Sequence, residues 1–302
     1  MKQIKGIIPI AATPFTHTGM VDEDSFQQMI RHFLQTGIQG ITLFGLATEF
    51  YKLTDEERRV MMQIMLAETS KHDEVVGMVS ITDHSLEVAV QRAREAEACG
   101  ADALMLLPPY FLQPSPQAIS DHIRAVASNV NIPIVVQYAP SQTGVRIAPE
   151  LFLELREQYD QVRFIKVETQ PPGRYVSELI AGSQGRLGAL VGYAGVQMPD
   201  VLARGASGIQ PGCSFSEIYV ELYRLFTSGD QAGFTRLFES LLPYISYWMQ
   251  GVELIIKVEK VILQKRGIIA SDYCRAPNYK LDVRETAEIE RFIEQFSSFL
   301  HC

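Results

Sequence analysis

The sequence has few of the features that mark several large classes of protein. Its 4 cysteines, Cys99, Cys213, Cys274 and Cys302, have neither the pairing of a disulfide framework nor metal-ligand spacing in a chain of 302 residues. No apolar run approaches the roughly 18 residues that a membrane-spanning helix needs. The N-terminal region lacks a signal-length apolar segment with a cleavage site. We therefore expect a cytoplasmic protein with reduced thiols and no membrane partner.

Basic residues are also in the minority. The chain has 27 Lys and Arg against 35 Asp and Glu, a net charge of −8, and no basic block. Nucleic-acid binding depends on neutralising phosphates, so we expect no nucleic-acid partner. The same charge gives an anionic small molecule no attraction from a distance. The 6 histidines are dispersed without helical pairing, so neither a metal nor a cofactor is expected.

The sequence does contain a repeated unit. Short apolar runs alternate with longer segments whose apolar residues recur at helical spacing. Hydrophobic residues make up 47% of the chain, which is enough for a full core. The apolar runs begin near Gly6, Gly40, Val75, Ala101, Ile132, Val162, Leu187 and Ser207.

This alternation predicts parallel strands joined by helices in right-handed crossovers. Eight units favour a (β/α)8 barrel over an open doubly wound sheet, because the glycine-rich GxGxxG loop typical of the open sheet is absent. We expect residues 1–212 to form the barrel and residues 213–302 to add its last helix and a helical extension, within one structural domain. In the C-terminal part we expect four helices, at 216–227, 232–249, 252–266 and 286–299. Two helix starts carry the pattern of a capping box, Thr54 with Glu57 and Ser214 with Glu217.

One lysine, Lys166, lies inside an apolar strand. Period-2 alternation puts it on one face with Val162 and Phe164, towards the barrel interior and near the catalytic end of the strand. Burial disfavours the charged form of an amine, and a neutral amine can attack a ketone to form a Schiff base. Glu168 leaves a second interpretation open, in which Lys166 only neutralises this carboxylate.

Tyr138 is a second candidate, near the end of the neighbouring predicted strand. Alternation groups it with Ile134 and Val136 on one face, where a phenol facing the barrel could transfer a proton beside the amine. The competing interpretation is a core tyrosine with a satisfied hydroxyl. Gly192 and Gln210, at the predicted ends of the last two strands, are expected as pocket walls.

Three segments carry a resemblance to a known family. The residues Gly-Leu-Ala-Thr-Glu-Phe at 45–50, Tyr-Ala-Pro-Ser-Gln-Thr-Gly at 138–144 and Phe-Ile-Lys at 164–166 resemble the dihydrodipicolinate synthase and N-acetylneuraminate lyase superfamily. The resemblance covers essentially the whole chain. It implies a class I lyase on a (β/α)8 barrel, often a homotetramer, acting on a small 2-keto acid, with Lys166 as Schiff-base lysine and Tyr138 as proton-transfer tyrosine.

Departures from the synthase pattern narrow the substrate. Leu46 and Ala47 replace two threonines of the synthases, so we expect the substrate carboxylate to bind backbone N–H groups of Ala47 and Thr48 and the Thr48 hydroxyl. The synthases follow the fourth strand with a tyrosine pair, where this chain has Tyr-Phe at 110–111. Gln142 stands where the synthases place an arginine for the carboxylate of aspartate semialdehyde. A neutral amide cannot form that guanidinium fork, so dihydrodipicolinate synthesis is disfavoured and Gln142 is expected at the substrate pocket.

Other features resemble the 2-keto-3-deoxy-arabonate dehydratases. They are Val-Gln at 136–137, Thr48, Lys-Val-Glu-Thr at 166–169 and Gly-Ile-Ile-Ala-Ser at 267–271. We therefore expect dehydration of a 2-keto-3-deoxy sugar acid through a lysine-bound imine. Retro-aldol cleavage to pyruvate and an aldehyde stays open. So does a function of another class, a barrel that binds a keto acid without reaction.

Overall fold

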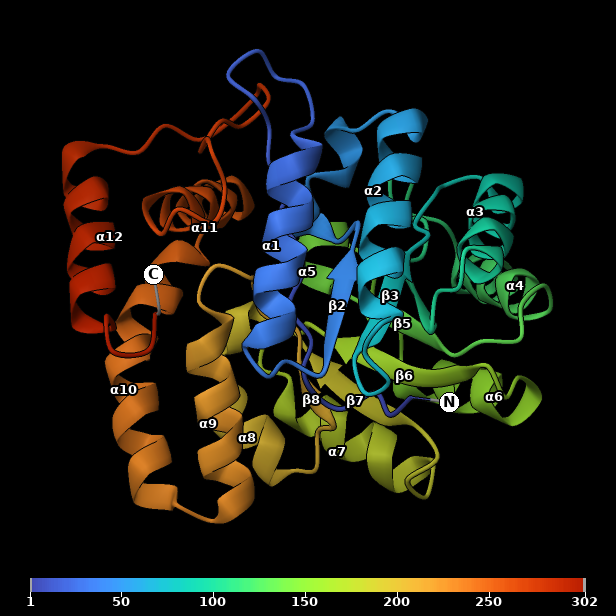
Figure 1. Cartoon of the computed structure of the whole chain (residues 1–302). Helices are drawn as coiled ribbons and strands as arrows, with labels where there is room; N and C mark the ends of the chain where they lie inside the picture. Colours follow the sequence, from blue (N-terminus) through green and yellow to red (C-terminus); the bar gives the residue numbers. More distant parts are fainter. Residues whose placement is uncertain (1, 301–302) are drawn as a thin grey trace. The chain divides into compact units, whose positions relative to one another are not determined.

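The structure of the protein is a computed structural model that describes residues 2–300 (Figure 1). These residues form two compact units. One comprises Val76–Gln210 with the residues up to Lys5, and the other comprises Gly6–Val75 with the residues from Pro211 onwards. The expected division between residues 212 and 213 stays a prediction. Cys302 lies outside the described residues, whereas the other three cysteines are free thiols.

The first unit is a series of strands and helices. Its strands are β3 (Val76–Ser80), β4 (Ala103–Leu106), β5 (Ile134–Tyr138), β6 (Val162–Val167), β7 (Gly188–Val191) and β8 (Gly208–Ile209). The connecting helices are α3 (Leu86–Ala98), α4 (Pro116–Ala127), α5 (Pro140–Thr143), α6 (Pro149–Gln158), α7 (Gly173–Gly182) and α8 (Met198–Ala203), with the 3₁₀ turn η3 (Tyr193–Gly195).

The strands of this unit pair in parallel and in chain order, from β3 to β8. Nearly all of their residues are buried. A parallel strand covered on both faces is an almost continuous apolar run, which is why the apolar runs predict these strands. Gln210, directly after β8, reaches Met78 of β3 with its Nε2 3.5 Å from Sδ. The sheet of this unit therefore curves enough to bring a side chain of β3 into contact with one that follows β8.

The second unit holds the two ends of the repeat. Pro9 follows the short first strand and has no N–H to donate, but its carbonyl accepts from the Thr42 N–H at 2.9 Å, and a bridge joins Ile10 to Thr42. Helices α1 and α2 lie side by side, as do α9 and α10 (Figure 1). The elements are β1 (Gly6–Ile7), α1 (Glu23–Gln35), β2 (Gly40–Leu43), η1 (Leu46–Thr48), η2 (Phe50–Lys52), α2 (Asp55–Thr69), α9 (Ser216–Ser228), α10 (Gln231–Trp248), α11 (Val252–Lys265) and α12 (Val283–Gln295).

The strand order is β1-β8-β7-β6-β5-β4-β3-β2, with helices between successive strands. This is the (β/α)8 barrel expected from the sequence, and the prediction is confirmed. The four expected C-terminal helices are also present, each beginning at or close to its expected position. None of the helices between residues 2 and 300 combines the length and the apolar content of a membrane-spanning segment.

Of the two expected capping boxes, one is confirmed. Thr54 Oγ1 accepts from the Glu57 N–H at 3.2 Å, and Glu57 Oε2 accepts from the Thr54 N–H at 2.9 Å. The box of Ser214 with Glu217 is wrong, since α9 begins without a side-chain cap. The carboxylate of Glu217 instead pairs with the guanidinium of Arg266. A charge-assisted hydrogen bond to an arginine is stronger than a hydrogen bond to a nearby backbone N–H, so the carboxylate pairs with the arginine.

Candidate active site

Lys166 lies near the end of β6 with its side chain buried. It pairs in register with Gln137 of β5 and Leu190 of β7. Paired residues of a parallel ladder point to the same face, and alternate residues along each strand point to opposite faces. Lys166 and Gln137 therefore share a face, and Val167 lies on the other.

Glu168 places a carboxylate beside the amine. Its Oε1 is 3.4 Å from Lys166 Nζ, and its Oε2 accepts a hydrogen bond of 2.5 Å from Gln137 Nε2. All three side chains are buried, with Lys166 and Glu168 exposed by only 5% and 10%. The neighbouring carboxylate expected from the sequence is thus present, and the amide of Gln137 holds it.

Gly192, directly after β7, leaves room for this carboxylate. A Cβ at this position would lie 1.9 Å from Glu168 Oε1 and 2.8 Å from Lys166 Cε. Its φ of −96° lies outside the positive region that favours glycine, and the two short distances show that glycine keeps space here for the side chains of Glu168 and Lys166. Gly192 and Glu168 line a pocket of about 410 Å³ between the loops after β6 and β7. The other residues lining this pocket are Val167, Thr169, Gln170, Pro171, Pro172, Val191, Tyr193, Val196 and Gln197.

Tyr138 lies on the opposite face of β5 from the amine. It pairs with Val167 in the ladder, its ring stacks on Tyr175 of α7 at 4.7 Å between centroids, and it meets Phe152 of α6 edge-on at 6.2 Å. The expectation that Tyr138 faces Lys166 is wrong. The neighbouring residue in the strand, Gln137, pairs with Lys166 instead. Its amide in an otherwise apolar strand is the sequence feature that could have indicated this position.

Thr48 and Ala47 belong to η1 in the second unit. The Thr48 hydroxyl donates to the Ala11 carbonyl at 2.7 Å, and the Thr48 N–H donates to the Gly45 carbonyl at 3.0 Å. Both Thr48 groups that were expected to hold a substrate carboxylate are therefore bonded within the chain. For Ala47, the role of its backbone N–H stays a prediction.

Two glutamines expected at the substrate pocket lie in different surroundings. Gln142 is exposed on the short helix α5, at the carboxyl end of β5. Gln210 is buried after β8, and its contact with Met78 directs it into the interior of the unit. Their roles in substrate binding stay predictions.

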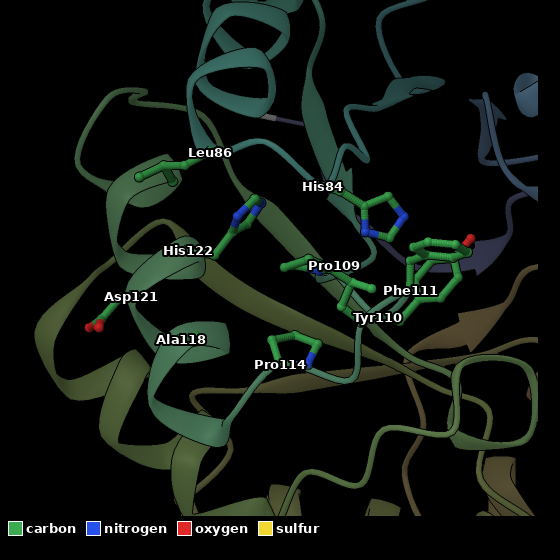
Figure 2. Close-up of a pocket in the computed structure, with 10 residues that line it drawn as sticks. His84, Leu86, Pro109, Tyr110, Phe111, Pro114, Ala118, Asp121 and His122 are labelled. Atoms are coloured by element: carbon green, nitrogen blue, oxygen red, sulfur yellow. The ribbon is translucent and has the colours of Figure 1, made fainter.

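A second pocket, of about 490 Å³, lies between the loops after β3 and β4 and helix α4 (Figure 2). His84 meets Tyr110 edge-on at 4.8 Å, and Phe111 is 78% exposed. Burial lowers the pKa of His122, which lines the same pocket. Among residues 2–300, no group of three His, Cys, Asp or Glu side chains is arranged to hold a metal ion.

Known proteins similar to this chain carry out more than one reaction. An L-2-keto-3-deoxyarabonate dehydratase of Azospirillum brasilense is 26% identical over 290 residues, 94% of this chain and 92% of that protein. A probable 2-dehydro-3-deoxy-D-pentonate aldolase of Escherichia coli is 24% identical over 280 residues, 92% of each chain. A 4-hydroxy-tetrahydrodipicolinate synthase of Methanococcus aeolicus is 30% identical over 207 residues, 68% of this chain and 69% of that protein.

Solved structures agree on the fold. A crystal structure of a dihydrodipicolinate synthase superposes with a TM-score of 0.88 at 25% identity, covering 97% of this chain and 99% of the other. The dihydrodipicolinate synthase of Rhodopseudomonas palustris gives a TM-score of 0.89 at 23% identity, covering 98% and 99%. Residues 3–296 match the model of the dihydrodipicolinate synthetase family. The chain therefore belongs to the dihydrodipicolinate synthetase family, whose members are class I lyases.

Proposed function

We propose that this protein is a Schiff-base lyase that dehydrates a 2-keto-3-deoxy sugar acid. The observation that carries the proposal is the buried amine of Lys166 with the Glu168 carboxylate 3.4 Å away on the same side of the sheet. A buried amine can form an imine with a ketone, and a carboxylate beside that imine can accept and return a proton. These are the two groups that the reaction needs.

The reaction begins when Lys166 Nζ attacks the C2 carbonyl of the keto acid, which loses its oxygen as water and becomes a protonated imine. The imine acidifies the protons on C3, two bonds from the nitrogen. Glu168 takes one of these protons, and the electron pair left on C3 forms an enamine. The enamine then expels the C4 hydroxyl, which leaves as water with the proton from Glu168. Hydrolysis of the imine frees Lys166, so that the substrate has lost one water overall.

The position of Glu168 favours dehydration over cleavage. Retro-aldol cleavage requires a base at the C4 hydroxyl, which lies further along the substrate from the nitrogen than C3 does. Glu168 stands next to the nitrogen. The phenol of Tyr138, the other base expected, lies on the far face of its strand. Cleavage to pyruvate and an aldehyde is the second candidate, favoured by the similarity to the Escherichia coli aldolase.

The rest of the site is proposed from position. Gly192 borders the site above Glu168, while Gln142 and Gln210 follow the ends of β5 and β8, where barrel enzymes bind substrates. We also propose a cytoplasmic homo-oligomer. Its support is the set of free thiols and the large apolar side chains of Phe111 and Leu112, which are 78% and 85% exposed.

The test is a product assay with 2-keto-3-deoxy-pentonates and 2-keto-3-deoxy-hexonates side by side. The proposal predicts a product that has lost one water, and no activity from Lys166→Arg. Pyruvate with an aldehyde would contradict dehydration. Condensation of pyruvate with aspartate semialdehyde would show that Gln142 does not exclude the synthase reaction.

A further inference from the structure

We infer that Gln137 is the positioning residue that aims Glu168 at the imine and thereby directs the enzyme to dehydration. The inference rests on the proposed function, since it concerns the proton acceptor of that reaction. Gln137 is 3% exposed in the interior of β5, opposite Lys166 in the ladder. A glutamine amide has no proton to transfer near neutral pH, so its contribution here is its hydrogen bond.

The hydrogen bond from Gln137 gives the two oxygens of Glu168 different roles. Oε2 accepts from Gln137 Nε2 at 2.5 Å, which fixes the plane of the carboxylate. Oε1 is then left facing Lys166 Nζ and the space that Gly192 keeps open. Oε2 sets the orientation of the carboxylate, and Oε1 is the oxygen that contacts the substrate.

The amide suits this task because its donor does not titrate. The bond from Gln137 occupies Oε2 and leaves Oε1 to accept the C3 proton. A phenol or an acid at the same position could exchange a proton with Glu168. The proton taken from C3 therefore stays on Glu168 until the C4 hydroxyl leaves with it.

Two variants separate positioning from mere packing. Gln137→Leu keeps the size of the side chain and removes the donor. Gln137→Glu keeps the shape but offers a donor only while one of the two facing carboxyls holds a proton. Lower pH favours that proton, because a like charge nearby disfavours ionisation of both groups. Gln158→Leu, at the exposed end of α6, is the matched control and leaves the site untouched.

The experiment measures kcat and KM for dehydration from pH 5 to 9, together with borohydride trapping of pyruvate on Lys166. For Gln137→Leu we expect kcat to fall about 100-fold, the cost of a misaimed catalytic group, with trapping retained because imine formation does not need the aimed carboxylate. For Gln137→Glu we expect activity to return as the pH falls.

The results that would overturn the inference are equally distinct. Gln137→Leu with unchanged kcat, or Gln137→Glu with the pH profile of the wild type, would show that Glu168 does not depend on this bond. Equal loss of trapping and turnover in a folded Gln137→Leu would assign Gln137 a packing role. If that variant does not fold, the pH profile of Gln137→Glu decides. Absence of trapping in the wild type would instead contradict the proposed function.

Discussion

Gly192→Ala changes one atom at the centre of the proposed site. The new Cβ would stand 1.9 Å from Glu168 Oε1, whereas ordinary contact begins at 3.4 Å, so the carboxylate must move by about 1.5 Å. Such a shift cannot preserve both the 2.5 Å bond to Gln137 and the 3.4 Å approach to Lys166. A misplacement of about 1 Å can cost 10²-fold in rate, so we expect kcat to fall about 100-fold or more.

The φ at Gly192 is −96°, outside the positive region that favours glycine, so the comparison concerns the space beside Glu168. Gly251→Ala is the control: its φ is −147°, and the nearest atom to the added Cβ lies at 3.6 Å. Steady-state kinetics with a 2-keto-3-deoxy acid and thermal melting would be measured for both variants. We expect the control to match the wild type in both assays.

A double-mutant cycle shows whether Gly192→Ala acts through the carboxylate. Glu168→Ala removes the closer clash together with the base and leaves only the 2.8 Å approach to the flexible Lys166 side chain, so adding Gly192→Ala to it should cost less than it does in the wild type. If the losses of the two single variants add fully in the double variant, Gly192→Ala does not act through Glu168. The assigned geometry of Glu168 is refuted if Gly192→Ala keeps kcat/KM within about 3-fold of the wild type, since such a change is too small for a displaced base.

Two stability predictions concern charges of the second unit. The bond from Arg275 lowers the pKa of Glu57, so its contribution is present above the unfolded pKa and is lost as the pH falls through the folded one. Glu57→Gln should cost about 1 kcal/mol in urea unfolding at pH 7 and nothing once the carboxyl is protonated, while Glu56→Gln, at a side chain 78% exposed, should cost less than about 0.5. Lys260→Met should cost about 3 kcal/mol, since it leaves the fully buried carboxylate of Glu49 without one of its two lysine partners, and a loss below about 1 kcal/mol would contradict this.

The sequence predicted the strands and helices well, because a strand buried on both faces and an amphipathic helix each have a distinct apolar pattern. The same pattern is why the face of Tyr138 was missed. An apolar run covered on both sides carries no alternation, and a shift of one residue moves every side chain to the other face. The pairing of Gln137 with Lys166 comes from the register between two strands, which a single strand does not contain.

Competition within the chain explains the other differences. Nothing near Thr48 in the sequence indicates that its hydroxyl bonds to the Ala11 carbonyl, 37 residues away. Likewise, Arg266, at the end of α11, pairs with the carboxylate of Glu217 in α9. Local sequence predicts which groups could donate or accept, and the folded chain decides which partner wins.

The proposed mechanism requires Lys166 to form an imine with a 2-keto acid. Its most direct test is to incubate the protein with pyruvate or a 2-keto-3-deoxy acid, reduce with borohydride, and locate the added mass by peptide mass spectrometry. We predict one adduct per chain, on Lys166, absent from Lys166→Arg. No adduct with any 2-keto acid would contradict the mechanism and favour a barrel that binds a keto acid without reaction. An adduct on another lysine alone would contradict the role of Lys166.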